Sequence, residues 1–310
     1  MTVDILLPFY GDVALMQLAV RSVLGQRNPD WRLTVVDDGY PDESIPGWFA
    51  GLGEQRVRYF RNETNLGANG NYNLCLTKVE HELVVVMGAD DVMLPNYVDV
   101  VLAAHEAFPQ AAIIQPGVDV IDEHGMLSRN LVDWSKKNVY APRGHGRRLL
   151  AGEHLAASLL RGDWLYFPSL CWRAEEITRR GFQPGLDVVQ DLALVLDIVA
   201  AGGSMLVDDT VCFQYRRHAA SDSSWRALEG TRFAEERRFF AQAEARMREL
   251  GWLPAARVAR RHLSSRINAA TLLPKAVKAR QTSGVRNLGR HVLGPRVSDL
   301  LAANRRDRDR

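Results

Sequence analysis

Apolar residues in the first 110 positions alternate between short continuous runs and longer stretches with helical spacing. The continuous runs predict strands at 3–7, 33–36, 57–60 and 83–87. The stretches that place apolar residues three and four positions apart predict helices at 13–24, 69–79 and 95–108. Apolar strands that alternate with helices form a parallel sheet covered on both faces, so the predicted fold class is α/β.

The pattern is less regular after residue 110. Strands are expected at 112–118 and 118–121, and the polar, glycine-rich and basic stretch 133–150 predicts a mobile loop. Helices are expected at 153–160, 175–180 and 191–201, followed by two short strands at 205–207 and 211–215. A long charged helix at 227–250, a basic helical region at 253–280 and a frayed end at 305–310 complete the chain.

Two pairs of aspartates directly follow predicted strands, Asp37-Asp38 and Asp90-Asp91. Ligands of such sheets bind beyond the carboxyl ends of the strands, so both pairs are expected on the ligand-binding edge. Carboxylates there suit Mg²⁺ or Mn²⁺ bridged to phosphate oxygens. Aspartate is equally common in strand-end turns and at helix N-termini, and spacing alone leaves both interpretations open.

The whole series of motifs resembles glycosyltransferase family 2. The matching segments, in family order, are the strand entering Pro-x-Tyr at 3–10, the "SVLxQ" helix end at 21–26, the "VVDDG" element at 35–39, the Asn-x-Gly turn at 61–67, and the "DxDD"-like element at 88–91 followed by Leu94-Pro95. Weaker matches follow at 122–125, 181–184, 190–194 and 215–218. The resemblance covers about residues 3–225 and leaves the rest unrecognised.

The resemblance implies a GT-A fold, which is a Rossmann-like mixed sheet flanked by helices, with a helical C-terminal extension. The implied catalytic domain spans 1–225, with a nucleotide-sugar half at 1–110 and an acceptor half at 111–225. A helical basic region occupies 226–310. The implied reaction is the inverting, metal-dependent transfer of one sugar from a UDP-, dTDP- or GDP-sugar to a hydroxyl of a sugar or lipid-linked acceptor.

The resemblance also assigns residues to this reaction. Asp191 is implied to be the catalytic base, with Asp187 as the nearest rival and a helix-capping role as the structural alternative. Asp90 and Asp91 are implied to hold Mn²⁺ or Mg²⁺. The implied donor-binding residues are Pro8, Tyr10, Asp37, Asp38, Asn65, Gly67, Asn71, Asp90, Arg217 and His218.

The chain departs from the family pattern at three positions. Gly88 stands where many relatives have the first Asp of the DxD motif, Gln190 replaces the Glu before the catalytic Asp, and Tyr40 replaces a Ser. Gly88 and Gln190 keep open a catalytically degenerate binding module. A nucleotidyltransferase is the other alternative, although residues 8–11 do not form its glycine-rich phosphate loop. No "QxxRW" motif of processive synthases is present, which favours a single sugar addition.

The net charge of +2 conceals a strong asymmetry. Residues 251–310 contain 14 Lys or Arg and 3 Asp or Glu, whereas the preceding residues contain 25 basic and 34 acidic ones. Leu263, Ile267 and Ala270 recur at helical spacing in this basic tail. Such a helix either lies on an anionic membrane surface or packs its apolar stripe on the catalytic domain. The tail has no interleaved aromatic residues, so a nucleic-acid partner is not expected.

Composition places the chain among ordinary globular proteins. Hydrophobic residues make up 46% and charged residues 25%, which excludes wholesale disorder. No apolar run reaches the roughly 20 residues that span a bilayer, no signal peptide is visible, and the three dispersed cysteines favour a reducing compartment. The expected location is the cytoplasm, peripheral to the inner face of the cell membrane, with a role in cell-envelope or polysaccharide biosynthesis.

Overall fold

The computed structural model describes residues 1–128, 130–217 and 231–293. These residues form two compact units. The first comprises Met1–Ala156 and Trp164–Arg217, and the second comprises Ala157–Asp163 together with the described residues from 231 onward. The expected boundary at residue 225 lies outside the described residues, so the domain division at that position stays a prediction.

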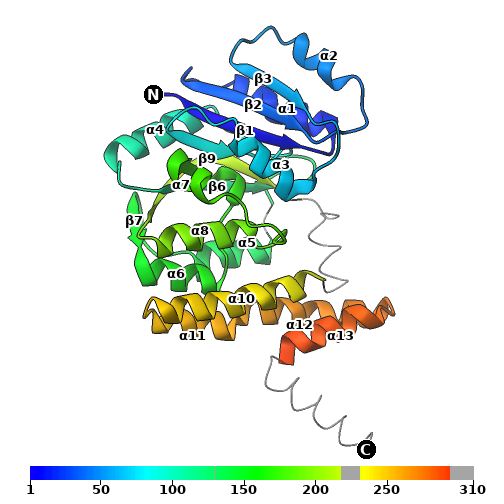
Figure 1. Ribbon diagram of the computed structural model, residues 1–310, viewed down its shortest axis with the longest axis vertical. Helices are drawn as coiled ribbons and strands as arrows, with labels where there is room; N and C mark the ends of the chain where they lie inside the picture. Colours follow the sequence, from blue (N-terminus) through cyan, green and yellow to red (C-terminus); the bar gives the residue numbers. More distant parts are fainter. Residues whose placement is uncertain (129, 218–230, 294–310) are drawn as a thin grey trace, which may run out of the picture. The chain divides into compact units, whose positions relative to one another are not determined.

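The first unit alternates strands and helices as the apolar pattern predicts (Figure 1). Its strands are β1 (Val3–Phe9), β2 (Trp31–Asp37), β3 (Val57–Arg61), β4 (Leu83–Val86), β5 (Val92–Met93), β6 (Ile113–Ile121), β7 (Arg148–Ala151), β8 (Cys171–Arg173) and β9 (Ser204–Arg216). Its helices are α1 (Val13–Leu24), α2 (Ile45–Ala50), α3 (Gly67–Leu76), α4 (Tyr97–Ala107), α5 (Leu131–Ser135), the π-helix η1 (Lys136–Tyr140), the first part of α6 (Gly152–Arg161), the 3₁₀ helix η2 (Phe167–Ser169), α7 (Ala174–Arg180) and α8 (Gln190–Ala200).

The strands of the described chain form one mixed sheet in the order β3-β2-β1-β4-β8-β6-β9-β5, and β7 adds to β9. β1 pairs in parallel with β2 and β4, and β2 pairs in parallel with β3. β8 runs antiparallel to both β4 and β6. The expected parallel sheet is therefore confirmed for the N-terminal half, and an antiparallel strand joins it to the rest.

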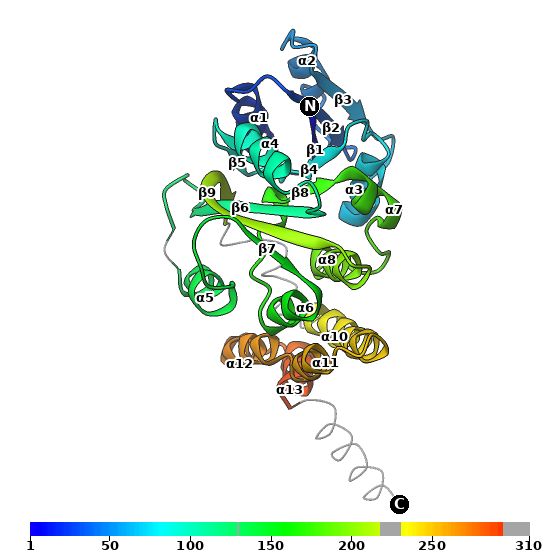
Figure 2. The ribbon, with the colours of Figure 1, turned by 90° about the vertical axis from the view of Figure 1, so that its left-hand side faces the viewer.

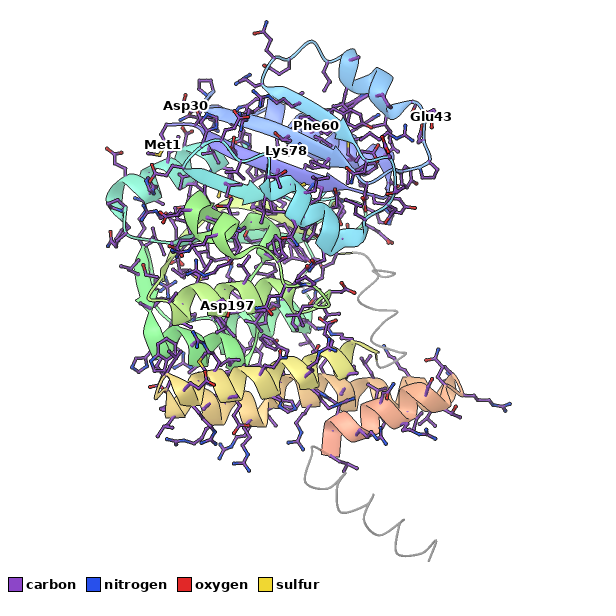
Figure 3. All side chains as sticks on the ribbon, viewed as in Figure 1. Met1, Asp30, Glu43, Phe60, Lys78 and Asp197 are labelled. Atoms are coloured by element: carbon purple, nitrogen blue, oxygen red, sulfur yellow. The ribbon has the colours of Figure 1, made fainter. Side chains whose placement is uncertain are left out.

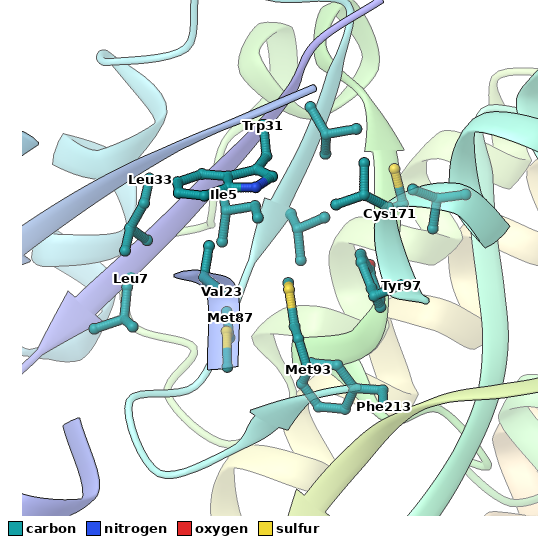
Figure 4. Packing of buried hydrophobic residues seen from close by; sticks show 14 of the residues in the cluster. Ile5, Leu7, Val23, Trp31, Leu33, Met87, Met93, Tyr97, Cys171 and Phe213 are labelled. Atoms are coloured by element: carbon teal, nitrogen blue, oxygen red, sulfur yellow. The ribbon is translucent and has the colours of Figure 1, made fainter. Parts of the chain in front are cut away.

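Side chains alternate between the two faces of this sheet. Ile5 and Leu7 of β1 lie with Leu33 of β2 in a core that α1 and α4 cover from one side (Figures 2 and 4). Trp31 and Tyr97 are among the largest side chains of this core and are 2% and 0% exposed. α3 covers the other face, where its Asn71 amide donates to the Val36 carbonyl at 2.9 Å. Successive side chains of a strand point to opposite faces of the sheet. Because both faces of this sheet are buried, the runs are continuously apolar.

Two surface contacts lie on the part of the sheet near the N-terminus. The Met1 amino group lies 3.5 Å from a carboxylate oxygen of Asp30, which directly precedes β2. The Lys78 ammonium lies 4.7 Å from the centre of the Phe60 ring on the edge strand β3 (Figure 3). Exposed pairs of this kind contribute little stability, so the edge depends on its ladder of backbone hydrogen bonds.

The structure corrects two expectations about the acceptor half. The two short strands expected at 205–207 and 211–215 are one strand, β9, whose pairing with β6 shifts register around Gly117. A Cβ at Gly117 would lie 2.6 Å from the Asp209 carbonyl oxygen, so only glycine lets the strands cross this bulge. The apolar run is interrupted at the bulge. In the sequence this interruption looks like a turn between two strands.

The stretch 133–150, expected to be a mobile loop, contains α5, η1 and β7. Asn130 caps α5, because its side-chain oxygen accepts the Asp133 backbone N–H at 2.9 Å. Arg147 and Arg148 of the β7 region pair with Asp208 and Asp209, at 2.8 and 2.9 Å. The partners of this stretch come from β9, far along the chain, so local composition does not reveal them.

The second unit contains the helices α10 (Thr231–Glu249), α11 (Leu253–Arg261), α12 (Leu263–Lys278) and α13 (Thr282–Leu293), together with the end of α6. The helical region expected at 253–280 breaks at His262, whose backbone φ is +29°. The apolar core of the second unit consists of Phe233, Ala269, Ala276 and Leu288. Ser265 and Ala269 lie on the buried face of α12.

The apolar stripe expected in the tail lies on the outside of α12. Leu263 and Ile267 are 61% and 52% exposed, and Ala270 is exposed as well. The stripe is therefore not part of the apolar core of the second unit, and both expected roles for it stay predictions. In the described part of the chain, no helix combines the length and the apolar character that crossing a membrane requires.

A buried polar cluster holds the second unit together. The Ser265 hydroxyl donates to Glu236 and lies 2.6 Å from Nε2 of His291, which is 0% exposed. His262 stacks on Phe240 with a centroid separation of 5.0 Å. Burial lowers the pKa of His291 to about 3, helped by the proximity of a second titratable histidine, His262, and of the charged Arg237 and Arg266. Burial also lowers the pKa of His262, so both histidines are neutral in the folded chain at neutral pH.

This cluster predicts that the second unit loses stability in acid. Between the folded pKa values and the unfolded value near 6.5, the unfolded chain binds more protons, so stability present above pH 6.5 falls as pH is lowered. The expected slope is about 1.4 kcal/mol per pH unit for each titrating histidine. Denaturant unfolding between pH 7.5 and 4.5 measures it. His291→Phe removes one titrating group and should flatten the slope, whereas the exposed His145→Asn should not. Equal slopes for wild type and His291→Phe would contradict the assignment.

Candidate active site

The two aspartate pairs lie on one edge of the sheet. β1, β2 and β4 run parallel, with Phe9 opposite Asp37 and Leu6 opposite Val86, so their carboxyl ends reach the same side. The Asp38 backbone N–H donates to the Phe9 carbonyl at 2.8 Å and continues the ladder by one residue. The expectation that the pairs share this edge is confirmed by the topology.

Asp37 and Asp38 are buried, at 0% and 2% exposed, and organise the loops after β2 and β3. Asp37 accepts the Tyr40 backbone N–H at 2.8 Å and the Tyr59 hydroxyl at 2.6 Å. Burial, followed by the hydrogen bond to Asp37, raises the pKa of Tyr59, so its proton stays in place. Asp38 Oδ1 accepts the Asn62 amide and the Leu66 backbone N–H, both at 2.8 Å.

The predicted donor-binding residues of the following turn connect to this network. Asn62 donates to the side-chain oxygen of the buried Asn71 at 3.2 Å. Asn65 accepts the Gly67 backbone N–H at 2.8 Å, and Gly67 has φ +74°. The left-handed conformation at Gly67 starts α3 and favours glycine.

At the end of β1, the partly buried Pro8 is followed by Tyr10, whose ring is 56% exposed. Tyr10 packs edge-on against Tyr40 with a centroid separation of 5.3 Å. Tyr40, which stands where the family pattern has Ser, therefore supports an exposed aromatic ring at this edge. Aromatic rings in such positions suit flat ligands.

The turn after β4 turns one aspartate inward. Asp91 is 1% exposed, and its Oδ1 accepts the Arg216 backbone N–H at 2.8 Å. The Arg216 guanidinium donates to the Asp90 carbonyl at 2.7 Å and to the Asp122 carbonyl at 3.0 Å. A Cβ at Gly88 would lie 2.4 Å from Asp91 Oδ2. The glycine at this position thus provides the space that the Asp91 carboxylate occupies.

The carboxylates of this turn fit a metal ion unequally. Burial raises the pKa of Asp91, and the charge of Asp90 raises it further, so a nearby cation would favour the ionised form of this pair. Asp90 is partly exposed. Among the described residues, no three acidic, histidine or cysteine side chains gather as a ready metal cage. Mg²⁺ commonly uses one carboxylate and the oxygens of a bound phosphate, and Asp90 fits such a site.

Asp191 lies in the first turn of α8, and its Oδ1 accepts the Leu192 backbone N–H at 2.8 Å. Asparagines of α3 hold the segment that leads into α8. Asn69 donates to the Gln183 and Leu186 carbonyls at 2.9 and 3.1 Å, and to the Gln190 side-chain oxygen at 3.0 Å. Gln190, the departure from the family Glu, therefore joins the start of α8 to α3.

The charge of Asp191 and the charges of the turn after β4 both affect the pKa values of two tyrosines. Burial raises the pKa of Tyr215 to about 12, and the charges of Asp91, Asp90 and Asp191 add to this effect. Burial and the charge of Asp191, followed by those of Asp90 and Asp91, also raise the pKa of Tyr72. The charges of all three carboxylates act on the same two hydroxyls, so the turn after β4 and the first turn of α8 lie within electrostatic reach of both tyrosines.

Tyr72 was missed by sequence reasoning, although it lies between Asn71 and Asn73 in the predicted helix after the Asn-x-Gly turn. Tyr215 belongs to a recognised segment but has no role in the family pattern quoted above. Their retained protons make both hydroxyls hydrogen-bond donors toward negatively charged ligand groups.

Arg217, predicted to bind the donor, forms a two-pronged ion pair with Asp133. Its Nε and terminal nitrogen lie 2.5 and 2.6 Å from the two Asp133 oxygens. Burial raises the pKa of Asp133, but the bonds and charge of Arg217 outweigh it and leave the pKa lowered. The Tyr166 hydroxyl also donates to Asp133 at 3.0 Å. His218, the next predicted residue, lies outside the described residues.

Solved structures with the same architecture are GT-A glycosyltransferases. TarS residues 1–349 from S. aureus, in complex with UDP-GlcNAc, matches with a TM-score of 0.62 and 12% identity, covering 93% of this chain and 90% of that one. The mannosyltransferase PcManGT from Pyrobaculum calidifontis, in complex with GDP-Man and Mn²⁺, matches with a TM-score of 0.55 and 15% identity, covering 96% and 86%. The fold is therefore GT-A, as the sequence pattern implied.

The family model described as Glycosyl transferase family 2 matches residues 4–167, more than half of the chain. The chain belongs to this family. An uncharacterized protein of Mycobacterium tuberculosis is 31% identical over 96 residues, which are 30% of this chain and 29% of that protein. An uncharacterized glycosyltransferase of Rickettsia felis is 28% identical over 128 residues, covering 41% and 21%. The chain thus matches less than a third of the length of either relative.

The close approach at Gly88 yields a prediction about stability. Gly88→Ala places a methyl group against the Asp91 carboxylate and should displace it from the Arg216 backbone. The expected cost is about 1–3 kcal/mol of unfolding free energy, typical of overpacking a buried site. Urea unfolding measures it, and Gly11→Ala is the matched control because a Cβ there meets no atom within 4 Å. Wild-type stability of Gly88→Ala would contradict the proposed packing.

Proposed function

We propose that this protein is an inverting glycosyltransferase that moves one sugar from a nucleotide-diphosphate donor to an acceptor hydroxyl. The observation that carries the proposal is the position of both aspartate pairs at the carboxyl edge of the parallel strands β2 and β4, together with the bond from Asn69 of α3 to Gln190 at the start of α8, beside Asp191. Membership of glycosyltransferase family 2 supports it. TarS and PcManGT, which share the fold, were solved with UDP-GlcNAc and GDP-Man.

In this proposal, the donor lies along the carboxyl edge of the sheet. Tyr10 offers an exposed ring to the nucleotide base, while the buried Asp37 and Asp38 hold the loops that surround the base and ribose. Pro8, Asn65, Gly67 and Asn71 shape the same loops. A Mn²⁺ or Mg²⁺ ion held by Asp90 would neutralise charge on the diphosphate. Tyr72 and Tyr215 donate hydrogen bonds toward the same negative group.

The acceptor reacts on the opposite side of the donor sugar. The Asp191 carboxylate takes the proton of the acceptor hydroxyl, and the oxygen forms a bond to the anomeric carbon. The bond from that carbon to the diphosphate breaks on the far side, and the nucleoside diphosphate leaves with the bonding electrons. Attack and departure on opposite faces invert the configuration. The Asn69–Gln190 hydrogen bond holds α8 so that Asp191 keeps its position.

Two of the three departures from the family pattern, Gly88 and Gln190, have structural roles in this arrangement. Gly88 leaves room for Asp91, and Gln190 bonds to Asn69 through an oxygen that a Glu would also provide. Neither change removes Asp90 or Asp191. These contacts favour an active enzyme over the degenerate binding module. The GT-A match also favours it over the nucleotidyltransferase alternative.

We further propose that the basic tail brings the enzyme to an anionic membrane surface. Residues 251–293 contain nine Lys or Arg and no Asp or Glu. The exposed stripe on α12 extends from Leu263 and Ile267 through Ala270 and Pro274 to Val277. Basic residues beside an apolar stripe are typical of helices in the membrane interface. This supports a peripheral enzyme at the inner face of the cell membrane that glycosylates a lipid-linked or envelope acceptor.

The metal role of Asp90 can be tested by Asp90→Asn. An amide keeps the shape but loses the charge that holds the ion, so donor binding should lose its dependence on Mn²⁺. Transfer should fall at least about a hundredfold, because metal stabilisation of the diphosphate is worth several kcal/mol. Calorimetric titration of the donor with and without Mn²⁺ measures the first effect. Full Mn²⁺-dependent transfer by the folded variant would refute the assignment of Asp90.

The base is tested by a matched pair of variants in one segment. Asp191→Asn should lower turnover by about 10² to 10⁴, the usual contribution of a general base, while donor affinity changes little. Asp187→Asn, an equal change at an exposed position four residues earlier, should keep turnover near the wild-type value. The reverse outcome would make Asp187 the base. Equal turnover for both variants and the wild type would leave the mechanism without its proton acceptor.

A further inference from the structure

A concentrated group of exposed apolar side chains lies on α5 and η1. Leu131 is 84% exposed, Val132 58%, Trp134 59% and Val139 56%. We call these four residues the apolar rim. Met126 and Leu127, just before it in the chain, are 68% and 63% exposed. Few soluble surfaces expose so many large apolar side chains within so short a segment, and such patches mark interaction sites.

The inward contact of Asp133 determines which side of α5 faces outward. Asp133 is 6% exposed and binds Arg217 with both carboxylate oxygens. Successive residues of a helix are about 100° apart, so Leu131 lies on nearly the opposite side of the helix from Asp133, with Val132 and Trp134 on the flanks. The ion pair between Asp133 and Arg217, the residue after β9, therefore turns the three rim residues on α5 away from this contact.

The same pin connects the apolar rim to the active site. Arg217 directly follows Arg216, whose backbone N–H donates to Asp91. Tyr166, which also binds Asp133, packs against Tyr215 with a centroid separation of 5.4 Å. Asp133, in the segment that carries the apolar rim, thus binds Arg217 and Tyr166. These two residues adjoin Arg216 and Tyr215 of the proposed active site.

The charge of this segment indicates what covers it. The body before residue 251 is acidic, yet residues 126–150 contain six Lys or Arg and a single acidic residue, Asp133, which is buried and paired. Arg147 and Arg148 pair with Asp208 and Asp209 of β9, so the remaining basic residues carry the charge of this segment. Lys137 and Arg143 are exposed. A basic segment that presents leucine, valine and tryptophan together is suited to the interface of an anionic bilayer, where tryptophan is favoured and lysine meets lipid phosphates.

We propose that the apolar rim inserts into the interface of an anionic membrane and holds the active site at the bilayer surface. The membrane contact itself does not depend on the proposed function. The inference rests on that function only where it says that the contact gives access to a hydroxyl of a membrane-borne acceptor. It is separate from the tail stripe on α12, because α5 and η1 belong to the other unit.

Tryptophan fluorescence with brominated lipids tests insertion locally. Phosphatidylcholine vesicles containing phosphatidylglycerol, with bromine on the acyl chains, should quench the full chain, because bromine quenches only indoles that enter the hydrocarbon boundary. Trp134→Phe should lose most of this quenching while it keeps binding. Quenching that is unchanged in Trp134→Phe would overturn the proposal.

Vesicle co-sedimentation tests the contribution to affinity. The double variant Leu131→Ser with Val132→Ser should bind phosphatidylglycerol vesicles at least about tenfold more weakly, since two large apolar side chains leave the lipid. Leu18→Ser, an exposed leucine of α1, is the matched control and should bind like the wild type. Binding that responds to Ile267→Ser on α12 but not to the double variant would overturn the proposal.

Sugar transfer to a water-soluble acceptor separates this inference from the proposed function. The double variant should transfer to such an acceptor at the wild-type rate, because the apolar rim touches no reacting group. A vesicle-binding defect with intact soluble transfer supports both proposals. Intact vesicle binding with intact transfer overturns only the membrane contact.

Discussion

The site depends on one buried contact between distant parts of the chain, the hydrogen bond from the Arg216 backbone to Asp91. It joins the turn after β4 to the end of β9, and the Arg216 guanidinium extends the junction to the Asp122 carbonyl. Asp91 is buried in this contact, whereas Asp90 is partly exposed, so the two carboxylates of the pair differ in their access to solvent. The acidic pair that reads as two equal ligands in the sequence consists of one buried and one partly exposed residue, and the proposed metal role is assigned to the exposed one.

A second constraint is the set of asparagines on α3. Asn71 binds the backbone of β2, Asn73 binds that of Phe182, and Asn69 binds the loop and side chain that open α8. One short helix thus attaches the nucleotide half of the sheet to the segment that carries Asp191. Side-chain amides suit this task, because each both donates and accepts and remains uncharged when buried. Gln190 extends the same network, which explains how this chain accommodates its departure from the family Glu.

Two surfaces of the described chain combine basic and apolar residues, one in the acidic body before residue 251 and one in the basic tail. One is the apolar rim on α5 and η1, and the other is the stripe on α12. Each lacks exposed acidic neighbours in its own segment, which is the combination that an anionic lipid surface attracts. In the proposed function, such surfaces would bring the enzyme and its soluble donor to an acceptor held in the bilayer.

The sequence by itself determined the alternation of strands and helices, the family and the edge where the aspartates gather, because period and short motifs are local properties of the chain. It predicted a loop at 133–150 and two strands in place of β9, because the partners that order these segments are distant in sequence. The tertiary structure alone decided that Asp91 points inward, that Asp133 captures Arg217, and that Leu263 and Ile267 are exposed. Burial and long-range pairing are set by packing between elements, and no local pattern specifies which carboxylate finds a partner.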